Sequence, residues 1–141
     1  MPTFTSATND TKVCGVRHIL LPVNDPQSKM TPQQLNNYLQ KNPNDFSKFV
    51  YTDSIDQTKV EHNIPLKNCL DNVPRKDPDQ FKAQATQCIE QHIGELPCFS
   101  PKAMPPEWAN KLQQMKPGTI DAVLIKDMNA VSIIQKPTMQ R

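Results

Sequence analysis

The sequence lacks the features of a membrane-embedded or polyanion-binding protein. Nowhere in its 141 residues is there a run approaching the roughly 20 apolar residues of a membrane helix. Its 16 basic and 14 acidic residues leave a net charge of only +2, and the two signs are interspersed. Without a stripe of one sign, neither nucleic acid nor a membrane surface is an expected partner.

The amino-terminal residues MPTFTSATNDTK also lack the apolar stretch of a secretory signal. The sequence leaves the compartment open, and a cytoplasmic location is expected only if nothing has been removed from the chain. If it is a mature or trimmed form, a periplasmic or secreted location is expected instead. The oligomeric state is not indicated by the sequence.

Metal and redox motifs are absent as well, because no two of the four cysteines form a CxxC pair. No metal site and no cofactor are therefore expected. Cys14 and Cys98 lie among apolar neighbours, which favours small buried thiols. Cys69 and Cys88 flank a polar stretch and are the better candidates for a disulfide, with free thiols as the alternative.

The length allows one domain with a single modest core. We predict a flexible arm over residues 1–12, a domain over 13–137 and a tail over 138–141. Within the domain, residues 57–94 are polar and proline-containing, which predicts an insertion that forms a helical cap on the domain. Phe81, Cys88 and Ile89 are expected to face inward there.

Local patterns predict an α+β domain. Apolar residues over 13–23 predict a strand, Thr31-Pro32-Gln33-Gln34 predicts a capped helix, and Phe46, Phe49 and Val50 form the stripe of a second helix. A helix follows Asp77, a short edge strand covers 96–99, and another helix begins near Pro105. Strands over 121–125 and 130–135 complete an antiparallel sheet with packed helices.

Four local motifs in this order resemble the parvulin family of peptidyl-prolyl isomerases, especially the parvulin domains of periplasmic chaperones. The motifs are Arg17-His18-Ile19-Leu20-Leu21, Asn44-Asp45-Phe46-Ser47-Lys48-Phe49, Gly94-Glu95-Leu96 through Phe99, and Met104 with Trp108 before the turn Lys116-Pro117-Gly118. The resemblance covers residues 13–136 except the insertion. It implies a four-stranded antiparallel sheet with the strand of His18 at its centre, beside the strand of Ile133 and Ile134.

The resemblance assigns a substrate-binding role to Met104 and Trp108, with Leu96 and Phe99 beside them and His18 beneath. A spacing of four places Met104 and Trp108 on one helix face, where they are either the wall of a proline pocket or ordinary core residues. His18 likewise is either a hydrogen-bonded core residue or the first of the family's two site histidines. The resemblance favours the site in both cases.

The catalytic half departs from the family. The second histidine is absent, and Ser132, or Val131 in the alternative register, stands in its place. The family's Cys or Asp falls at Ser54 or Asp53.

The resemblance implies a weak peptidyl-prolyl isomerase that acts on X-Pro bonds of unfolded or extended polypeptide. The alternatives are a catalytically silent peptide-binding chaperone or scaffold, and a small adaptor that is similar in fold alone.

Overall fold

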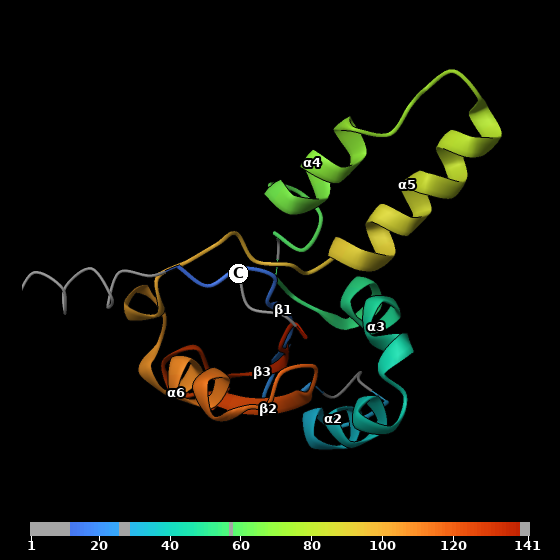
Figure 1. Ribbon diagram of the computed structural model, residues 1–141. Coiled ribbons are helices and arrows are strands. Elements are labelled where there is room, and N and C mark those ends of the chain that lie inside the picture. The colour runs from blue at the N-terminus through green and yellow to red at the C-terminus, as the bar shows by residue number, and fades with distance from the viewer. Residues whose placement is uncertain (1–11, 26–28, 57, 139–141) are drawn as a thin grey trace, which may run out of the picture.

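The computed structural model describes residues 12–25, 29–56 and 58–138 (Figure 1). The predicted arm and tail thus lie almost entirely outside the described residues. In chain order the elements are β1 (Arg17–Pro22), α2 (Pro32–Lys41), the 3-10 turn η1 (Pro43–Asp45), α3 (Phe46–Asp53), α4 (Ile64–Asp71), α5 (Pro78–His92), η2 (Pro101–Ala103), α6 (Pro106–Gln114), β2 (Ile120–Ile125), η3 (Lys126–Met128) and β3 (Ala130–Gln135). The α+β class is as the sequence predicts.

The sheet is antiparallel and has three strands in the order β1-β3-β2. His18 lies opposite Ile134, and Ile19 opposite Ile133, which confirms the predicted pairing of these two segments. The prediction that β1 is the central strand is wrong for this regular sheet, because β3 is central.

The predicted fourth strand does not form as a regular strand among the described residues. The segment 95–99 runs beside β1 and the residues before it, with one isolated bridge to β1, Arg17–Glu95, and one to the preceding segment, Val13–Phe99. Pro97 lies between them and has no N–H to donate to a ladder, which explains the interruption. The edge of β1 is therefore covered by an irregular segment.

Helices cover both faces of the sheet, since side chains alternate along each strand. One core contains Ile19, Leu21 and Ile133 from the sheet together with residues of α2 and α3. The other contains Leu20 and Ile134 together with the buried face of α6. His18 and Ser132 have the same strand parity as Leu20 and Ile134, so they belong to the α6 face.

The helix starts follow the predicted capping chemistry. Thr31 accepts a hydrogen bond from the backbone of Gln34, whose side chain binds back to the backbone of Thr31. Asp77 caps α5 in a similar way through Asp79 and Gln80. These local signals explain why the sequence predicts both helices correctly.

The insertion forms a helical arm, not the predicted cap. Figure 1 shows α4 and α5 lying side by side and projecting away from the sheet. The arm has its own small core of Leu66, Val73 and Cys88, with half-buried Phe81 packed against it. Ile89 is 43% exposed, so its predicted inward orientation is wrong.

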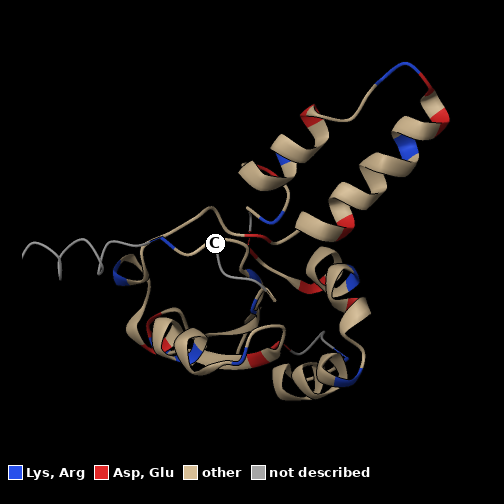
Figure 2. Cartoon of the chain, viewed as in Figure 1, with Lys and Arg blue, Asp and Glu red and all other residues tan. Residues whose placement is uncertain are grey.

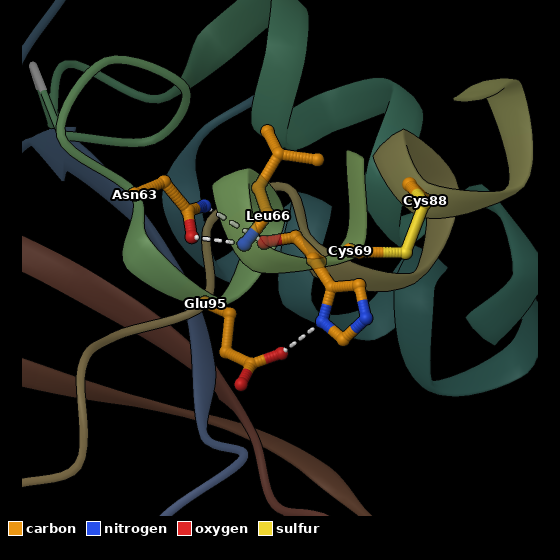
Figure 3. Close-up of a disulfide and its surroundings, with 6 residues drawn as sticks. Asn63, Leu66, Cys69, Cys88 and Glu95 are labelled. Atoms are coloured by element: carbon orange, nitrogen blue, oxygen red, sulfur yellow. Dashed lines mark hydrogen bonds and ion pairs between the residues drawn. A yellow bond between two sulfur atoms is a disulfide. The ribbon is translucent and has the colours of Figure 1, made fainter. Parts of the chain in front are cut away.

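Two disulfides include all four cysteines. Cys69 and Cys88 join α4 to α5 (Figure 3), so the pair that the sequence offers as the better disulfide candidate is bonded, and the alternative of free thiols is wrong. Cys14 and Cys98 are also bonded to each other, so the interpretation as buried thiols is wrong. Their bond links the segment before β1 to the irregular segment 95–99. Among the residues described, no helix combines the length and apolar character needed to cross a membrane.

Candidate functional site

His18 is the centre of a buried polar network on the α6 face of the sheet. Its Nδ1 lies 3.1 Å from the hydroxyl oxygen of Ser132, and its Nε2 lies 2.8 Å from a carboxylate oxygen of Asp56. The Trp108 indole N–H donates to the same Ser132 oxygen at 2.9 Å. We call His18, Ser132, Asp56 and Trp108 the His18 network.

Trp108 fixes one donor and one acceptor in this network. An indole N–H can only donate, so the Ser132 oxygen must accept from it. In the tautomer of His18 that carries its proton on Nε2, the Ser132 hydroxyl donates to Nδ1 and the Nε2–H donates to Asp56. With every donor matched to an acceptor, the network can lie in a water-poor interior without an unsatisfied group.

The network resolves the register left open at the end of the chain. Ser132 is fully buried and bonded to His18, whereas Val131 lies on the opposite side of β3 and pairs with Leu21 and Leu124. Ser132 is therefore the residue that faces His18.

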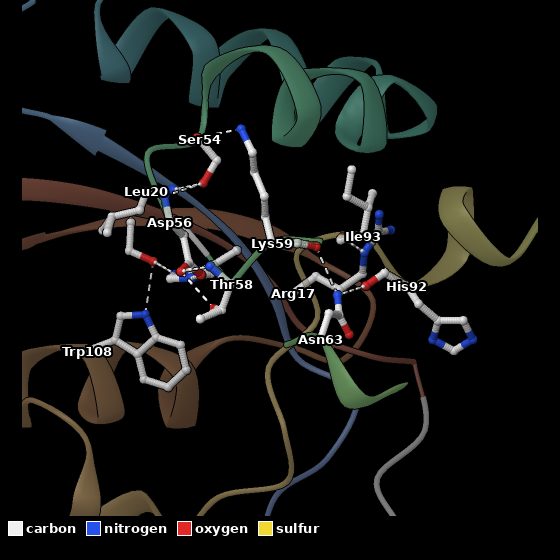
Figure 4. A network of polar contacts seen from close by, with 12 residues as sticks. Arg17, Leu20, Ser54, Asp56, Thr58, Lys59, Asn63, His92, Ile93 and Trp108 are labelled. Atoms are coloured by element: carbon white, nitrogen blue, oxygen red, sulfur yellow. Dashed lines mark hydrogen bonds and ion pairs between the residues drawn. The ribbon is translucent and has the colours of Figure 1, made fainter. Parts of the chain in front are cut away.

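Ser54 and Asp53 differ sharply in their surroundings (Figure 4 shows Ser54). The buried Ser54 hydroxyl accepts from the backbone N–H groups of Leu20 and Asp56, at 3.0 and 3.3 Å. Asp53 ends α3, and its side chain makes no hydrogen bond or ion pair with the residues described. Ser54 thus fixes the chain between α3 and Asp56, and neither residue contacts His18 through a hydrogen bond.

The partner of His18 is Asp56, which sequence reasoning missed. The second oxygen of its carboxylate accepts from the backbone N–H and the hydroxyl of Thr58, at 2.9 and 2.7 Å. The hydrogen bond from His18, aided by those from Thr58, holds the pKa of Asp56 well below its usual range, although partial burial opposes this shift. The spacing Asp-x-Thr is typical of an Asx turn and was the available signal.

The apolar half of the site brings together the four residues proposed from the resemblance. Leu96, Phe99 and Met104 are half-buried and pack against the core that contains Trp108, and we call these four residues the Trp108 cluster. The Phe99 and Trp108 rings meet edge to face with centroids 5.4 Å apart. Trp108 itself is only 1% exposed, so its indole supports the cluster from beneath and offers almost no surface to a ligand.

Arg17 anchors the edge of the site from the other side of β1. Its guanidinium donates to the carbonyl of Ile93 and to the side chains of Ser47 and Gln135, at 2.7–3.1 Å. Burial lowers the pKa of Arg17 to about 10, while the nearby charge of Glu95 opposes that shift. Arg17 remains protonated at neutral pH and ties α3, α5 and β3 together, so its role is structural.

The described residues contain no group of three or more His, Cys, Asp or Glu side chains arranged to hold a metal ion. Comparisons of the chain with protein-family models, with curated proteins and with solved structures find no match. Functional reasoning therefore rests on the geometry of the His18 network and the Trp108 cluster.

Proposed function

We propose that this chain is a parvulin-type module that binds proline-containing segments of unfolded or extended polypeptide and catalyses their peptidyl-prolyl isomerisation weakly. One observation carries the proposal. The indole of Trp108 joins a half-buried apolar cluster directly to a polar network built on His18. An apolar surface for a proline ring beside polar groups for its amide is the combination that this reaction needs.

The chemistry requires little from the protein. Rotation about an X-Pro bond crosses a barrier of roughly 18–20 kcal/mol, and no covalent bond forms or breaks. The side chains of Phe99, Met104 and Leu96 provide apolar surface against which a proline ring can pack. Acceleration then depends on groups that stabilise the twisted amide better than the planar one.

Such groups are scarce here, which is why we propose weak activity. Both ring nitrogens of His18 are already hydrogen-bonded, and the N–H of Trp108 is directed at Ser132. The network therefore shapes and stiffens the floor of the site. A polypeptide amide gains stabilisation from it only if one of these internal bonds opens.

The arrangement of the chain around β1 also supports the proposal. When the irregular segment 95–99 is counted beside β1, the order across the sheet is this segment, β1, β3 and β2. His18 then lies on an inner strand, between Leu96 and Phe99 on one side and Ser132 on the other. This order is similar to the four-stranded arrangement that the resemblance implies, although the segment 95–99 is not a regular strand.

The cysteine pairing bears on where the protein works. Disulfides persist in oxidising compartments and are rare in the cytosol. Since all four cysteines are paired, we propose a periplasmic or secreted location for this module.

A second candidate function is peptide binding without catalysis. It is favoured specifically by the near-complete burial of Trp108 and by the absence of an unused donor in the His18 network. Binding on Phe99 and Met104 requires neither a free histidine nitrogen nor an exposed indole.

A protease-coupled isomerisation assay with short proline peptides separates the two candidates. We expect slow but measurable acceleration that Met104→Ser reduces through lost apolar contact, with peptide binding weakened in parallel. Met128→Ser is the matched control, because Met128 is 54% exposed in the turn between β2 and β3 and lies outside the cluster. Saturable binding without acceleration would establish the second candidate, and the absence of both would refute the proposal.

The missing second histidine provides a gain-of-function test. Ser132 is fully buried against Trp108, so Ser132→His alone would overpack the site. Combining it with Trp108→Phe removes part of the indole and offsets the added volume. We expect the double variant to isomerise proline peptides faster than the wild type, and a folded double variant with no gain would argue against a family-like geometry at this position.

A further inference from the structure

The helical arm carries a pocket that is separate from the His18 network. It has a volume of about 560 Å³ and runs along α4, from Val60 and Ile64 at one end to Arg75 at the other. Its lining is mostly apolar and includes Leu66 and Leu70. The volume is within the range of roughly 300–1,000 Å³ typical of ligand sites.

Hydrogen bonds and a disulfide hold α4, the helix that lines the pocket, in place. The buried Asn63 side chain caps α4 by accepting from the N–H of Leu66 (Figure 3), and it donates to the carbonyls of Lys59 and His92 (Figure 4). Next to it, His62 adopts a φ of 60°, an unfavourable conformation for a residue with a side chain. The disulfide between α4 and α5 holds the other side of α4 in place.

The two ends of the pocket differ chemically. Val60 and Ile64 are apolar yet 43% and 55% exposed, which leaves surface for a partner. At the far end, Lys67 is paired with Asp71 at 2.8 Å, but Arg75 has no carboxylate partner among the residues described. Arg75 lies instead over the Phe81 ring, 4.8 Å from its centroid. Figure 2 shows in blue the basic residues of the loop between α4 and α5, which contains Arg75 and Lys76.

The spacing of the two ends indicates the kind of partner. Helix α4 lies between the two ends and rises about 10 Å from Ile64 to Asp71, at about 1.5 Å per residue, and Arg75 follows its carboxyl end, so this rise gives their approximate separation. An extended polypeptide covers that length in about three residues. We propose that the arm is a second polypeptide-binding site, for an extended segment that carries a bulky apolar side chain and, about three residues away, an acidic one. The apolar side chain packs against Val60 and Ile64, and the carboxylate pairs with Arg75.

The test uses the full chain and a proline-free fluorescein-labelled peptide, GESSLSSEG, whose acidic residues flank leucine in both directions. We expect saturable binding by fluorescence anisotropy, weakened about fivefold or more by Arg75→Glu and about fivefold by Ile64→Ser. Lys41→Glu on α2 and Ile89→Ser on α5 are the matched controls, since both residues are exposed and lie outside the pocket, and each should change affinity less than about twofold. A peptide with serine in place of leucine should bind as weakly as the wild-type peptide binds to Ile64→Ser. A peptide with lysine in place of both glutamates should lose affinity as Arg75→Glu does.

Several outcomes would overturn this site. They are no saturable binding up to about 1 mM peptide, equal losses in the pocket and control variants, or a dimer that Ile64→Ser dissociates and the peptide does not. The last would identify a second copy of the chain as the occupant. Because the probe contains no proline, its binding to the arm and the isomerase activity of the protein are tested separately. Either one can be absent while the other is present.

Discussion

Replacing Ser132 by alanine tests the His18 network independently of any function. The Ser132 oxygen lies 2.9 Å from the indole nitrogen of Trp108 and 3.1 Å from Nδ1 of His18, and none of the three groups has ready access to water. The variant therefore leaves a buried donor and a buried ring nitrogen without partners. Each such group costs about 1–3 kcal/mol, and because His18 is not completely buried we expect a loss in the lower part of the summed range, about 2–4 kcal/mol in the free energy of unfolding.

Urea denaturation followed by circular dichroism measures this loss, which corresponds to a fall in melting temperature of roughly 8–15 °C for a chain of this size. Ser100→Ala is the control. Ser100 precedes η2 without a side-chain cap, so its replacement should change stability by less than about 0.5 kcal/mol.

A double-mutant cycle identifies the partner. In a Trp108→Phe background the indole donor is already absent, so Ser132→Ala should cost about 1–2 kcal/mol less than it does in the wild type. Equal costs in the two backgrounds would refute the assigned hydrogen bond. A cost below about 0.5 kcal/mol in the wild type would refute the network as a whole.

Three further predictions concern the surroundings of the site. Because the folded-state pKa of Asp56 is depressed, its ionised form stabilises the fold above the unfolded value of about 3.9, and this contribution is lost as the pH falls through the folded pKa. Asp56→Asn should thus destabilise the protein by about 1–2 kcal/mol at neutral pH, after discounting for partial exposure, and the gap to the wild type measured by thermal melts should close in acid. Replacing Cys69 and Cys88 by serine should cost about 3 kcal/mol for a loop of this length, with hydrogen exchange accelerated in the arm and little changed in the sheet. Gly94→Ala should reduce stability more than Gly15→Ala, as measured by chemical denaturation. Both glycines have positive φ, but of the two only Gly94 would bring the added carbon within 3.0 Å of neighbouring atoms. Similar losses for the two variants would argue against close packing at Gly94.

Local signals in the sequence were sufficient for most helices, whereas the pairing of β1 with β3 needed the family resemblance. The capping residues Thr31 and Asp77 mark helix starts because their side chains bind backbone groups within three residues. The strand of Ile133 is mostly apolar, and its pairing with β1 followed from the resemblance. Helix α4 was not predicted as a separate element, although Asn63 and Pro65 form a recognisable start, because only the helix after Asp77 was placed within the polar insertion.

Features that depend on distant contacts could not be predicted from local patterns. Cys14 and Cys98 are 84 residues apart in the sequence, and nothing near either one indicates its partner. The role of Asp56 similarly depends on the turn after α3, which places its carboxylate beside His18. Choosing between Ser132 and Val131 required the register of β3, since a shift of one residue exchanges the two faces of a strand.

Trp108 and Ser132 are best understood as one unit. A large indole beneath the Trp108 cluster reaches a small hydroxyl on β3, and that hydroxyl reaches His18. Any tilt of the indole caused by a ligand on Phe99 would lengthen a buried hydrogen bond and so carry an energetic cost. Because of this cost, apolar contact at the surface is expected to leave the hydrogen bonds of the His18 network intact. Stabilising a twisted amide, by contrast, requires one of these hydrogen bonds to open, so binding and catalysis are separable. Substitutions in the His18 network should therefore change the isomerisation rate more than they change the affinity for proline peptides.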